Sequence, residues 1–362
     1  MSLLPDADSF KRLVDGSARG PAATLARAAL AVLAAPYGIA VRARNAGYDA
    51  GLCRSSRAPV PVISVGNLTL GGTGKTPLVA WLVRRIAAAG LAPAIVSRGY
   101  GARAGGQSDE AAELAVLLPG VPHVANRDRV AGARAAAAGG AQVVVLDDGF
   151  QHRRLARDLD IVAVDATDPF GCGHLFPRGL LREPMRGLAR AQAVVLTRAG
   201  LVDERRRQEI RAALAAARGA PPTVWAEAAH RPLQLRTASG GTLALESLRG
   251  MRIAAFAGIG NPAAFRATLS GLGADIVGFR ALADHHAYSA ADIAALGAWA
   301  GGLRADMAIT TLKDLVKIGT DRLGKIPLAA VEIAIDMLAG EADLASLLAP
   351  LLAQTGPAPG HS

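Results

Sequence analysis

The sequence contains few cysteines and few lysines. Its two cysteines, Cys53 and Cys172, cannot form a disulfide framework or a cysteine-rich metal site. We therefore expect a reduced, cytosolic protein. Only five of the 40 basic residues are lysines, and the basic residues exceed 30 acidic ones to give a net charge of +10. This excess favours anionic partners such as nucleic acid, phosphorylated ligands or an anionic membrane surface.

The sequence also lacks a long uninterrupted apolar run. Its N-terminus carries acidic residues and no extended apolar core, so we expect no signal peptide. The most apolar stretch, residues 22–41, is interrupted by Arg27, Pro36 and Gly38, so its apolar run is shorter than the ~20 residues of a membrane-spanning helix. Two interpretations stay open: an interfacial helix on anionic lipid, or a helix packed on the protein's own core. Arginines flank or interrupt the stretch at Arg19, Arg27, Arg42 and Arg44.

The charged fraction is too low for a disordered chain. Charged residues make up 19% of the sequence and apolar residues 51%. This composition supports a large buried core. A length of 362 residues is enough for two domains.

Short apolar runs alternate with helical stretches from about residue 60 onward. Helices are predicted at residues 75–89, 109–118 and 128–138. The intervening runs are almost continuously apolar, as in strands buried on both faces, and cover residues 61–65, 92–97, 142–146, 160–164 and 193–197. Strands that alternate with helices indicate βαβ units. We predict an α/β fold with a mostly parallel sheet and helices on both faces.

The pattern changes near residue 230. Residues 233–245 alternate about a Ser-Gly-Gly turn, which predicts a β-hairpin linker. A second region of strands and helices follows, with a helix start at Asn261-Pro262. We predict an N-terminal helical segment (1–58), a first α/β domain (59–230), the linker (231–250), a second, smaller α/β domain (251–345) and a C-terminal helix end and tail (346–362). The last nine residues are expected to be disordered.

The sequence GNLTLGGTGKTP, at 66–77, lies between a predicted strand and a predicted helix. Glycines let backbone N–H groups turn toward an anion, and the helix N-terminus adds its positive end. Lys75 can reach the β- and γ-phosphates, and the Thr76 hydroxyl can bind Mg²⁺. The alternative is an ordinary glycine-rich turn, and the general pattern has glycine where this chain has Thr69. We predict a P-loop NTPase-like first domain that binds nucleotide through Thr69, Leu70, Gly71, Gly72, Thr73, Gly74, Lys75 and Thr76.

Two acidic residues, Asp147 and Asp148, follow the strand at 142–146. In P-loop proteins a carboxylate at such a strand end holds Mg²⁺. The alternative is that these acids cap the next turn. We predict a metal role for both, with Gln151 and His152 facing the phosphates or the acceptor.

A nucleotide site is compatible with two classes of protein. One is a small-molecule or lipid kinase, and the other is a partitioning or chaperone-type ATPase without a small-molecule acceptor. A GTPase switch would carry an N/T-K-x-D motif that reads the base. The nearest matches do not fit, because residues 197–200 (TRAG) lack the final aspartate and residues 311–314 (TLKD) have the wrong spacing.

A kinase also needs a base near the γ-phosphate to orient the acceptor hydroxyl. Asp109 starts a predicted helix, and the segment ADHHAYS offers Asp284, His285 and His286 from the second domain. We expect the carboxylate of one domain and an imidazole of the other to meet when the domains close. The plainer alternative is that Asp109 caps its helix and the histidines are solvated.

Seven segments in order resemble the tetraacyldisaccharide 4′-kinase family, the lipid A 4′-kinases of Gram-negative bacteria. They are SVGNLTLGGTGKTP, VSRGYGAR, DDGFQHRRLARDLDIVAVD, PRGLLREP, AGIGNPAAF, ADHHAYS and TLKDLVK. The resemblance extends from about residue 20 to about residue 345, and DDGFQH is distinctive among P-loop proteins. Thr69 is normal at its position in this family.

The resemblance implies an ATP- and Mg²⁺-dependent kinase that phosphorylates the 4′-hydroxyl of a tetraacylated disaccharide 1-phosphate in lipid A biosynthesis. It implies a peripheral protein on the cytosolic face of the inner membrane. Its partners are then the acylated lipid and the anionic membrane surface, with no nucleic acid and no obligate protein partner. The implied site has Asp109 as the base paired with His285, Lys75 and Thr76 at the phosphates, Glu183 near the metal with Asp147 and Asp148, and Arg182 as a phosphate contact.

The chain departs from the family pattern in two places. The family usually has Gly-Asp-Glu where this chain has Ser108-Asp109-Glu110, which keeps the aspartate. It usually has Thr-Glu-Lys-Asp at 311–314, so we infer no role for Leu312 and only a weak one for Lys313. Arg98 follows a predicted strand and is expected on the same rim as the P-loop, where it would contact substrate. A structural bond to a loop carbonyl is the alternative for Arg98.

Overall fold

A computed structural model describes residues 7–99, 108–219 and 222–353 of the chain. The chain divides into two units. Of the described residues, 7–99, 117–229 and 335–353 belong to the first unit, and 108–116 and 230–334 to the second. The tail that is expected to be disordered lies outside the described residues, as do residues 100–107 of the SRGYGAR segment.

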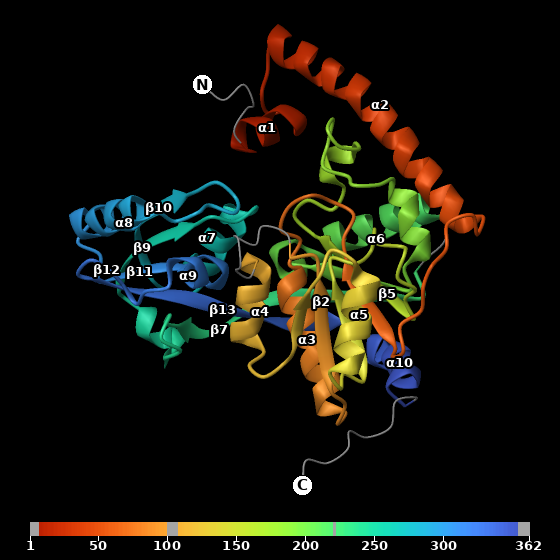
Figure 1. Ribbon diagram of the computed structural model, residues 1–362. Helices are drawn as coiled ribbons and strands as arrows, with labels where there is room; N and C mark the ends of the chain where they lie inside the picture. The colour runs from red at the N-terminus through yellow and green to blue at the C-terminus, as the bar shows by residue number, and fades with distance from the viewer. Residues whose placement is uncertain (1–6, 100–107, 220–221, 354–362) are drawn as a thin grey trace. The chain divides into compact units, whose positions relative to one another are not determined.

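The first unit is built on a parallel sheet (Figure 1) with the strand order β7-β6-β5-β1-β4-β2-β3. Each neighbouring pair of these strands is parallel. Five of the strands are buried along their whole length, which confirms the prediction from continuous apolar runs. The strands are β1 (Val62–Gly66), β2 (Pro93–Ser97), β3 (His123–Ala125), β4 (Val143–Asp147), β5 (Leu159–Asp165), β6 (Ala193–Thr197) and β7 (Val224–Arg236).

Helices connect these strands and cover the sheet. Asp128 caps α5 by accepting from Val130 N, and Asp203 caps α6 by accepting from Arg206 N. Apolar side chains of α5 pack on β1, β2 and β4, and those of α6 pack on β5 and β6. The helices of this unit are α1 (Ala7–Val14), α2 (Pro21–Asp49), α3 (Lys75–Ala88), α5 (Arg129–Ala138), α6 (Glu204–Arg218) and α10 (Glu341–Ala353).

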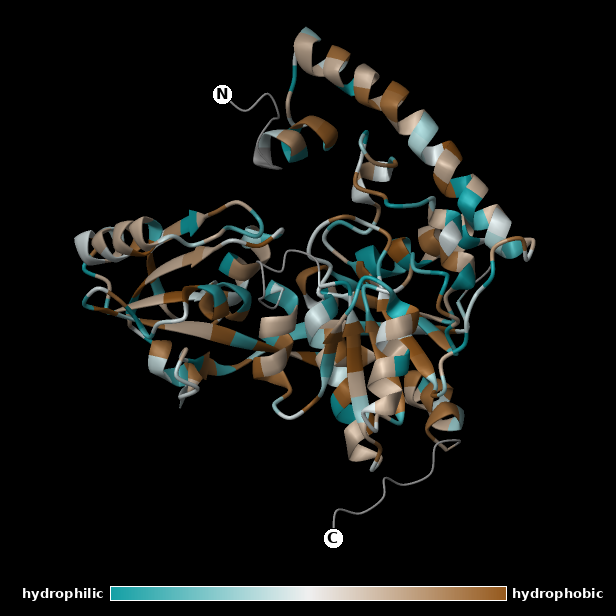
Figure 2. Ribbon diagram, in the orientation of Figure 1, coloured by the Kyte–Doolittle hydropathy of each residue, from teal (hydrophilic) through white to brown (hydrophobic). Residues whose placement is uncertain are grey.

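Helix α2 is long, apolar and poorly buried. Pro36 and Gly38 interrupt its apolar sequence but not the helix, which runs on to Asp49. An 18-residue window has a mean hydropathy of 1.6 with 11% of it buried, so α2 could cross a membrane by length and composition alone. Its exposed apolar residues are visible in Figure 2 and include Leu25, Val32, Leu33 and Ile39, which are 58–73% exposed. This low burial argues against the interpretation of residues 22–41 as a helix packed on the core.

The second unit has its own, smaller parallel sheet with the strand order β10-β9-β11-β13. The predicted hairpin is confirmed, because β8 (Thr242–Leu243) pairs antiparallel with the end of β7. Asn261 caps α7 (Pro262–Ser270) with Pro262 as its first residue, also as predicted. The other elements are α4 (Asp109–Leu117), β9 (Arg252–Ala257), β10 (Asp275–Ala281), α8 (Ala290–Gly302), β11 (Met307–Thr311), α9 (Leu312–Ile318), β12 (Arg322–Leu323) and β13 (Ile326–Ala339).

Candidate active site

The predicted P-loop lies between β1 and α3. Gly71 and Gly74 have φ values of 101° and 73°, a region that glycine adopts without steric cost. The start of the loop pairs with residues 180–182, since Leu70 N donates to Leu180 O (2.7 Å) and Arg182 N donates to Leu68 O (2.8 Å). The loop is therefore held from one side by a segment distant in sequence.

A second support of the P-loop comes from the end of β6 and was missed in the sequence. Thr197 is fully buried, and its hydroxyl donates to Thr73 O (2.7 Å). Arg198 follows it, donates to Gly72 O (2.8 Å) and forms a buried ion pair with Asp165. Both carbonyls are thereby fixed from the side of the sheet. These residues had been examined only as a failed base-reading motif, although their place at the carboxyl end of a strand is itself a signal.

Lys75 and Arg182 both contact the carboxylate of Asp148. Lys75 Nζ lies 2.7 Å from Asp148 Oδ1 and 3.0 Å from Asn67 Oδ1. Arg182 Nη1 lies 2.8 Å from each Asp148 oxygen. Burial alone would raise the pKa of Asp148, but the charges of Lys75 and Arg182 outweigh it and hold this pKa well below its usual range. The structure therefore brings together three predicted site residues as a charged group beside the P-loop.

The DDGF segment packs closely against the end of β1. A Cβ added to Gly66 would lie 2.5 Å from Phe150 Cβ, so only glycine fits there. Asp148 has a φ of 53°, which aspartate tolerates better than most residues. Asp147 is the last residue of β4 and is buried, and Thr76 is in the first turn of α3. Both predicted residues thus lie at elements that border the P-loop.

Glu183 was predicted near the metal, but its contacts are those of a structural residue. It is fully buried, and Arg190 Nη2 donates to both of its oxygens at 2.9 Å. Gln151 Nε2 and Asn45 Nδ2 each bond one oxygen at 3.0 Å. With both oxygens engaged in this way, these contacts do not support a metal ligand. Gln151 also donates to Asn67 O (2.8 Å), so it ties Glu183 to the P-loop.

Two other predicted residues lie outside this hydrogen-bonded group. Burial, with the charge of Arg129, lowers the pKa of His152 to about 4, so its imidazole is neutral at pH 7. Its Nε2 atom is buried without a hydrogen-bond partner in the part of the chain that the structure describes. Arg98 directly follows β2 and is exposed, as a rim residue would be.

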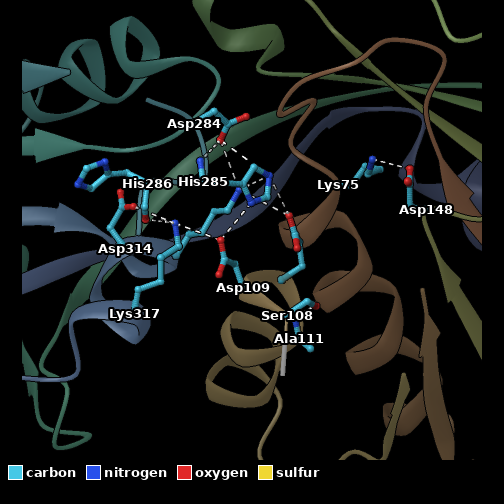
Figure 3. A network of polar contacts seen from close by, with 12 residues as sticks. Lys75, Ser108, Asp109, Ala111, Asp148, Asp284, His285, His286, Asp314 and Lys317 are labelled. Atoms are coloured by element: carbon cyan, nitrogen blue, oxygen red, sulfur yellow. Dashed lines mark hydrogen bonds and ion pairs between the residues drawn. The ribbon is translucent and has the colours of Figure 1, made fainter. Parts of the chain in front are cut away.

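The second unit brings Asp109 and His285 together (Figure 3). Asp109 Oδ2 lies 3.0 Å from His285 Nδ1 and 3.1 Å from Lys317 Nζ. Residues 108–116 belong to this unit, so the pair lies within one unit and not across two as expected. Ser108 Oγ accepts from Ala111 N (3.3 Å), so the helix start has a capping side chain other than Asp109. Lys317 is a further residue that the sequence did not single out.

The opposite edge of the imidazole faces Lys313. Lys313 Nζ lies 3.2 Å from His285 Nε2 and 3.5 Å from both Glu110 Oε1 and Asp284 Oδ1. Burial alone would lower the pKa of Lys313, but the two carboxylates outweigh it and raise this pKa, so the ammonium stays charged. An ammonium can only donate, so Nε2 of the neutral ring accepts. The proton then sits on Nδ1 and is donated to Asp109.

Lys317 is itself held by a buried carboxylate. Asp314 is fully buried and accepts from Gly258 N (2.9 Å) and Thr311 Oγ1 (2.7 Å), with Lys317 Nζ at 3.5 Å. His286, the neighbour of His285, instead packs edge-on against Tyr288 with ring centroids 4.9 Å apart. Of the two predicted histidines, only His285 contacts Asp109 in the described residues.

Comparison with known proteins agrees with this geometry. A family model described as Tetraacyldisaccharide-1-P 4′-kinase matches residues 26–353. A tetraacyldisaccharide 4′-kinase of Anaeromyxobacter sp. (strain Fw109-5) is 44% identical over 335 residues, which cover 86% of this chain and 88% of the relative. A protein of the same name from Syntrophus aciditrophicus (strain SB) is 42% identical and covers 83% and 86%.

A solved structure is similar over almost the whole chain. The crystal structure of LpxK from Aquifex aeolicus in complex with ATP has a TM-score of 0.70 at 28% identity, covering 90% of this chain and 99% of that chain. Sequence and fold thus agree over the two units. The chain therefore belongs to the tetraacyldisaccharide-1-P 4′-kinase family and, like its relatives, is a phosphotransferase that acts on a hydroxyl group.

Proposed function

We propose that the protein transfers the γ-phosphoryl group of ATP to the 4′-hydroxyl of a tetraacyldisaccharide 1-phosphate. The observation that carries this proposal is the contact between Asp109 and His285. A base for an acceptor hydroxyl is what a kinase needs and what an ATPase without a small-molecule acceptor lacks. Two further findings support it: the relatives are named for this reaction, and the Aquifex structure holds ATP.

Asp109 would act as the base through its free oxygen. Oδ2 is occupied by His285 and Lys317, and among the described residues none bonds Oδ1. Oδ1 would accept the proton of the acceptor hydroxyl as the oxygen attacks the γ-phosphorus. His285, with its proton on Nδ1, would fix the carboxylate and stabilise it.

The P-loop would bind the nucleotide phosphates. Its exposed backbone N–H groups and the start of α3 favour an anion. Lys75 is already at the loop and contacts Asp148 in the absence of nucleotide. It would transfer this contact to the β- and γ-phosphates, with Arg182 as a second cation nearby. Phosphoryl transfer depends mainly on such positioning and charge neutralisation.

The oxygen donors beside the P-loop suit Mg²⁺. Within the described residues no group of three or more His, Cys, Asp or Glu could hold a metal. This fits Mg²⁺, which takes one or two protein ligands and completes its shell with water and phosphate. Thr76 and Asp147 would hold the ion, and Asp148 is engaged by two cations. Bound Mg²⁺ supplies neutralisation of the phosphate charge.

The test follows labelled γ-phosphate in detergent micelles with and without tetraacyldisaccharide 1-phosphate. The proposal expects label in the lipid and slow ATP hydrolysis without acceptor. A partitioning or chaperone-type ATPase would hydrolyse ATP at the same rate whether or not the lipid is present. A protein that leaves the lipid unlabelled under these conditions would contradict the proposal.

We also propose that α2 docks the protein on the cytosolic face of the inner membrane. Its exposed apolar residues recur with the helical period, as at Leu25, Val32 and Ile39, and so form one face. Such a face lies in the lipid interface and gains free energy from apolar burial. The helix then holds the enzyme where its acylated acceptor resides.

Flotation on anionic vesicles tests this docking. Val32→Ser combined with Ile39→Ser should leave the fold intact, because both side chains are exposed, and should release the protein from vesicles. Leu201→Ser is the matched control, since Leu201 is also exposed but lies near the start of α6. Docking elsewhere is indicated if the double variant floats like the wild type.

A further inference from the structure

A groove lies between α2 and the segment of residues 173–185, within the first unit. Its volume is about 430 Å³. We call it the α2 groove; its apolar walls are Ala31, Ala34 and Ala35 on α2 and Leu175, Leu181, Pro184 and Met185 on the facing segment. The alanines leave the helix side of the groove open because their side chains end at Cβ. The size and lining are those of a site for an apolar ligand.

The walls of the α2 groove are fixed relative to each other. Tyr37 Oη donates to Arg182 O (2.6 Å), and a Cβ added to Gly38 would lie 2.9 Å from Leu175 Cδ1. Asn45, one turn further on, bonds the buried Glu183. The groove therefore belongs to the folded protein and does not depend on a loosely attached helix.

The α2 groove leads directly to the P-loop. Leu181 lines the groove, and its neighbours Leu180 and Arg182 pair with the backbone of Leu70 and Leu68. The side chain of Arg182 continues to Asp148. A ligand in the groove would thus lie beside the segment that supports the start of the phosphate-binding loop.

Positive side chains border the same groove. Arg42, Arg178 and His174 line it together with the apolar residues. Arg178 is anchored through Nη1 to Val14 O (3.2 Å), so its guanidinium is held in place. An apolar floor with two arginines at its border matches a ligand that has an alkyl chain and an anionic head.

We propose that the α2 groove binds one acyl chain of the acceptor lipid, with the phosphate of that lipid on Arg42 and Arg178. This inference rests on the proposed function and assigns the acceptor a place in the first unit. The exposed apolar face of α2 borders the membrane in that proposal, so a chain could pass from the bilayer into the groove without crossing water. A bulk phospholipid has the same chemistry, and the experiment separates the two.

The first experiment fills the groove. Ala31→Leu combined with Ala35→Leu narrows it, and leucine keeps the helix because its helix propensity is close to that of alanine. We expect the KM for a long-chain acceptor to rise about tenfold or more, because overpacking is costly. The KM for a short-chain acceptor should change less. Binding of a fluorescent ATP analogue and flotation on vesicles should be unchanged or, for flotation, stronger.

The matched control places the same side chains on the other face of α2. Ala29 and Ala40 are exposed and do not line the groove. Ala29→Leu with Ala40→Leu should leave the acceptor KM within about twofold of the wild type. Equal effects of both pairs, or equal effects on long-chain and short-chain acceptors, would overturn the groove as an acyl-chain site. Competition of the wild type by excess bulk phospholipid, at an affinity equal to that of the acceptor, would assign the groove to phospholipid instead.

The second experiment tests the arginines. Acceptors with and without the 1-phosphate are compared, and the ratio of their kcat/KM values should fall about tenfold in Arg42→Gln or Arg178→Gln. Arg186→Gln is the control, because Arg186 is exposed in the adjoining turn and does not line the groove. An unchanged ratio in both arginine variants would overturn the phosphate contact. If the wild type phosphorylates no acylated disaccharide at all, the proposed function fails, and not this inference alone.

Discussion

The support of the P-loop by β6 predicts the effect of one methyl-for-hydroxyl exchange. Thr197→Val keeps the shape of the side chain but removes the donor to Thr73 O. Thr197 is fully buried and Thr73 nearly so, so water cannot replace the lost bond. Leaving a buried carbonyl without its donor costs about 1–3 kcal/mol. We expect the free energy of unfolding to fall by that amount.

The same exchange should weaken nucleotide binding, because the freed carbonyl no longer holds the loop with its N–H groups outward. If the loop must be reordered at a cost of about 1.4 kcal/mol, ATP affinity falls about tenfold. Thr310→Val is the matched control. Thr310 is also fully buried on a strand and donates to a backbone carbonyl, Phe256 O (3.0 Å), but belongs to the second unit.

Urea unfolding of the nucleotide-free protein and titration with a fluorescent ATP analogue measure the two effects. Both variants should lose similar stability, and only Thr197→Val should lose ATP affinity. The reasoning is refuted if Thr197→Val is destabilised but binds the analogue as tightly as the wild type. In that case the hydroxyl contributes to the core and not to the loop.

Three further predictions concern the site. Lys75→Ala should lower turnover by at least ~10²-fold in a protein that is folded by circular dichroism, and near-normal turnover would remove the P-loop assignment. Asp109→Ala and His285→Ala should each lower kcat, and the double variant should be little worse than the worse single one; multiplicative losses would show that the two act independently. Because the pKa of His152 falls from 6.5 to about 4 on folding, its contribution to stability is complete above pH 6.5 and is lost as the pH falls toward 4. The urea midpoint of the wild type should therefore drop more between about pH 7 and about pH 5 than that of His152→Gln, and parallel curves would contradict this.

The strands and helix starts were predictable because they depend on local sequence. A strand buried on both faces needs a short, continuous apolar run, and β6 occupies the predicted residues 193–197 while β1 is shifted by one. The start of α7 was predictable because Asn261 supplies a capping oxygen and Pro262 fits the first helical position. Lys75 and Asp148 were found for the same reason, since each lies at the end of a local pattern.

Contacts between distant segments were not predictable from local patterns. Thr197 and Lys317 act on residues more than 100 positions away, and nothing beside them in the sequence names those partners. The burial of Glu183 depends on Asn45 of α2, and without that contact its carboxylate resembled a metal ligand. Helix α2 continues through Pro36 because a single proline costs one backbone bond and a local clash, which a helix of 29 residues tolerates.

Transfer of labelled γ-phosphate from ATP to tetraacyldisaccharide 1-phosphate, measured beside ATP hydrolysis in the same samples, tests the central claim most directly. The wild type should label the lipid at the 4′-position, with little hydrolysis when the acceptor is omitted. Asp109→Ala should abolish labelling while binding of a fluorescent ATP analogue persists. Hydrolysis at an equal rate with and without the lipid, and no label in the lipid, would contradict the account.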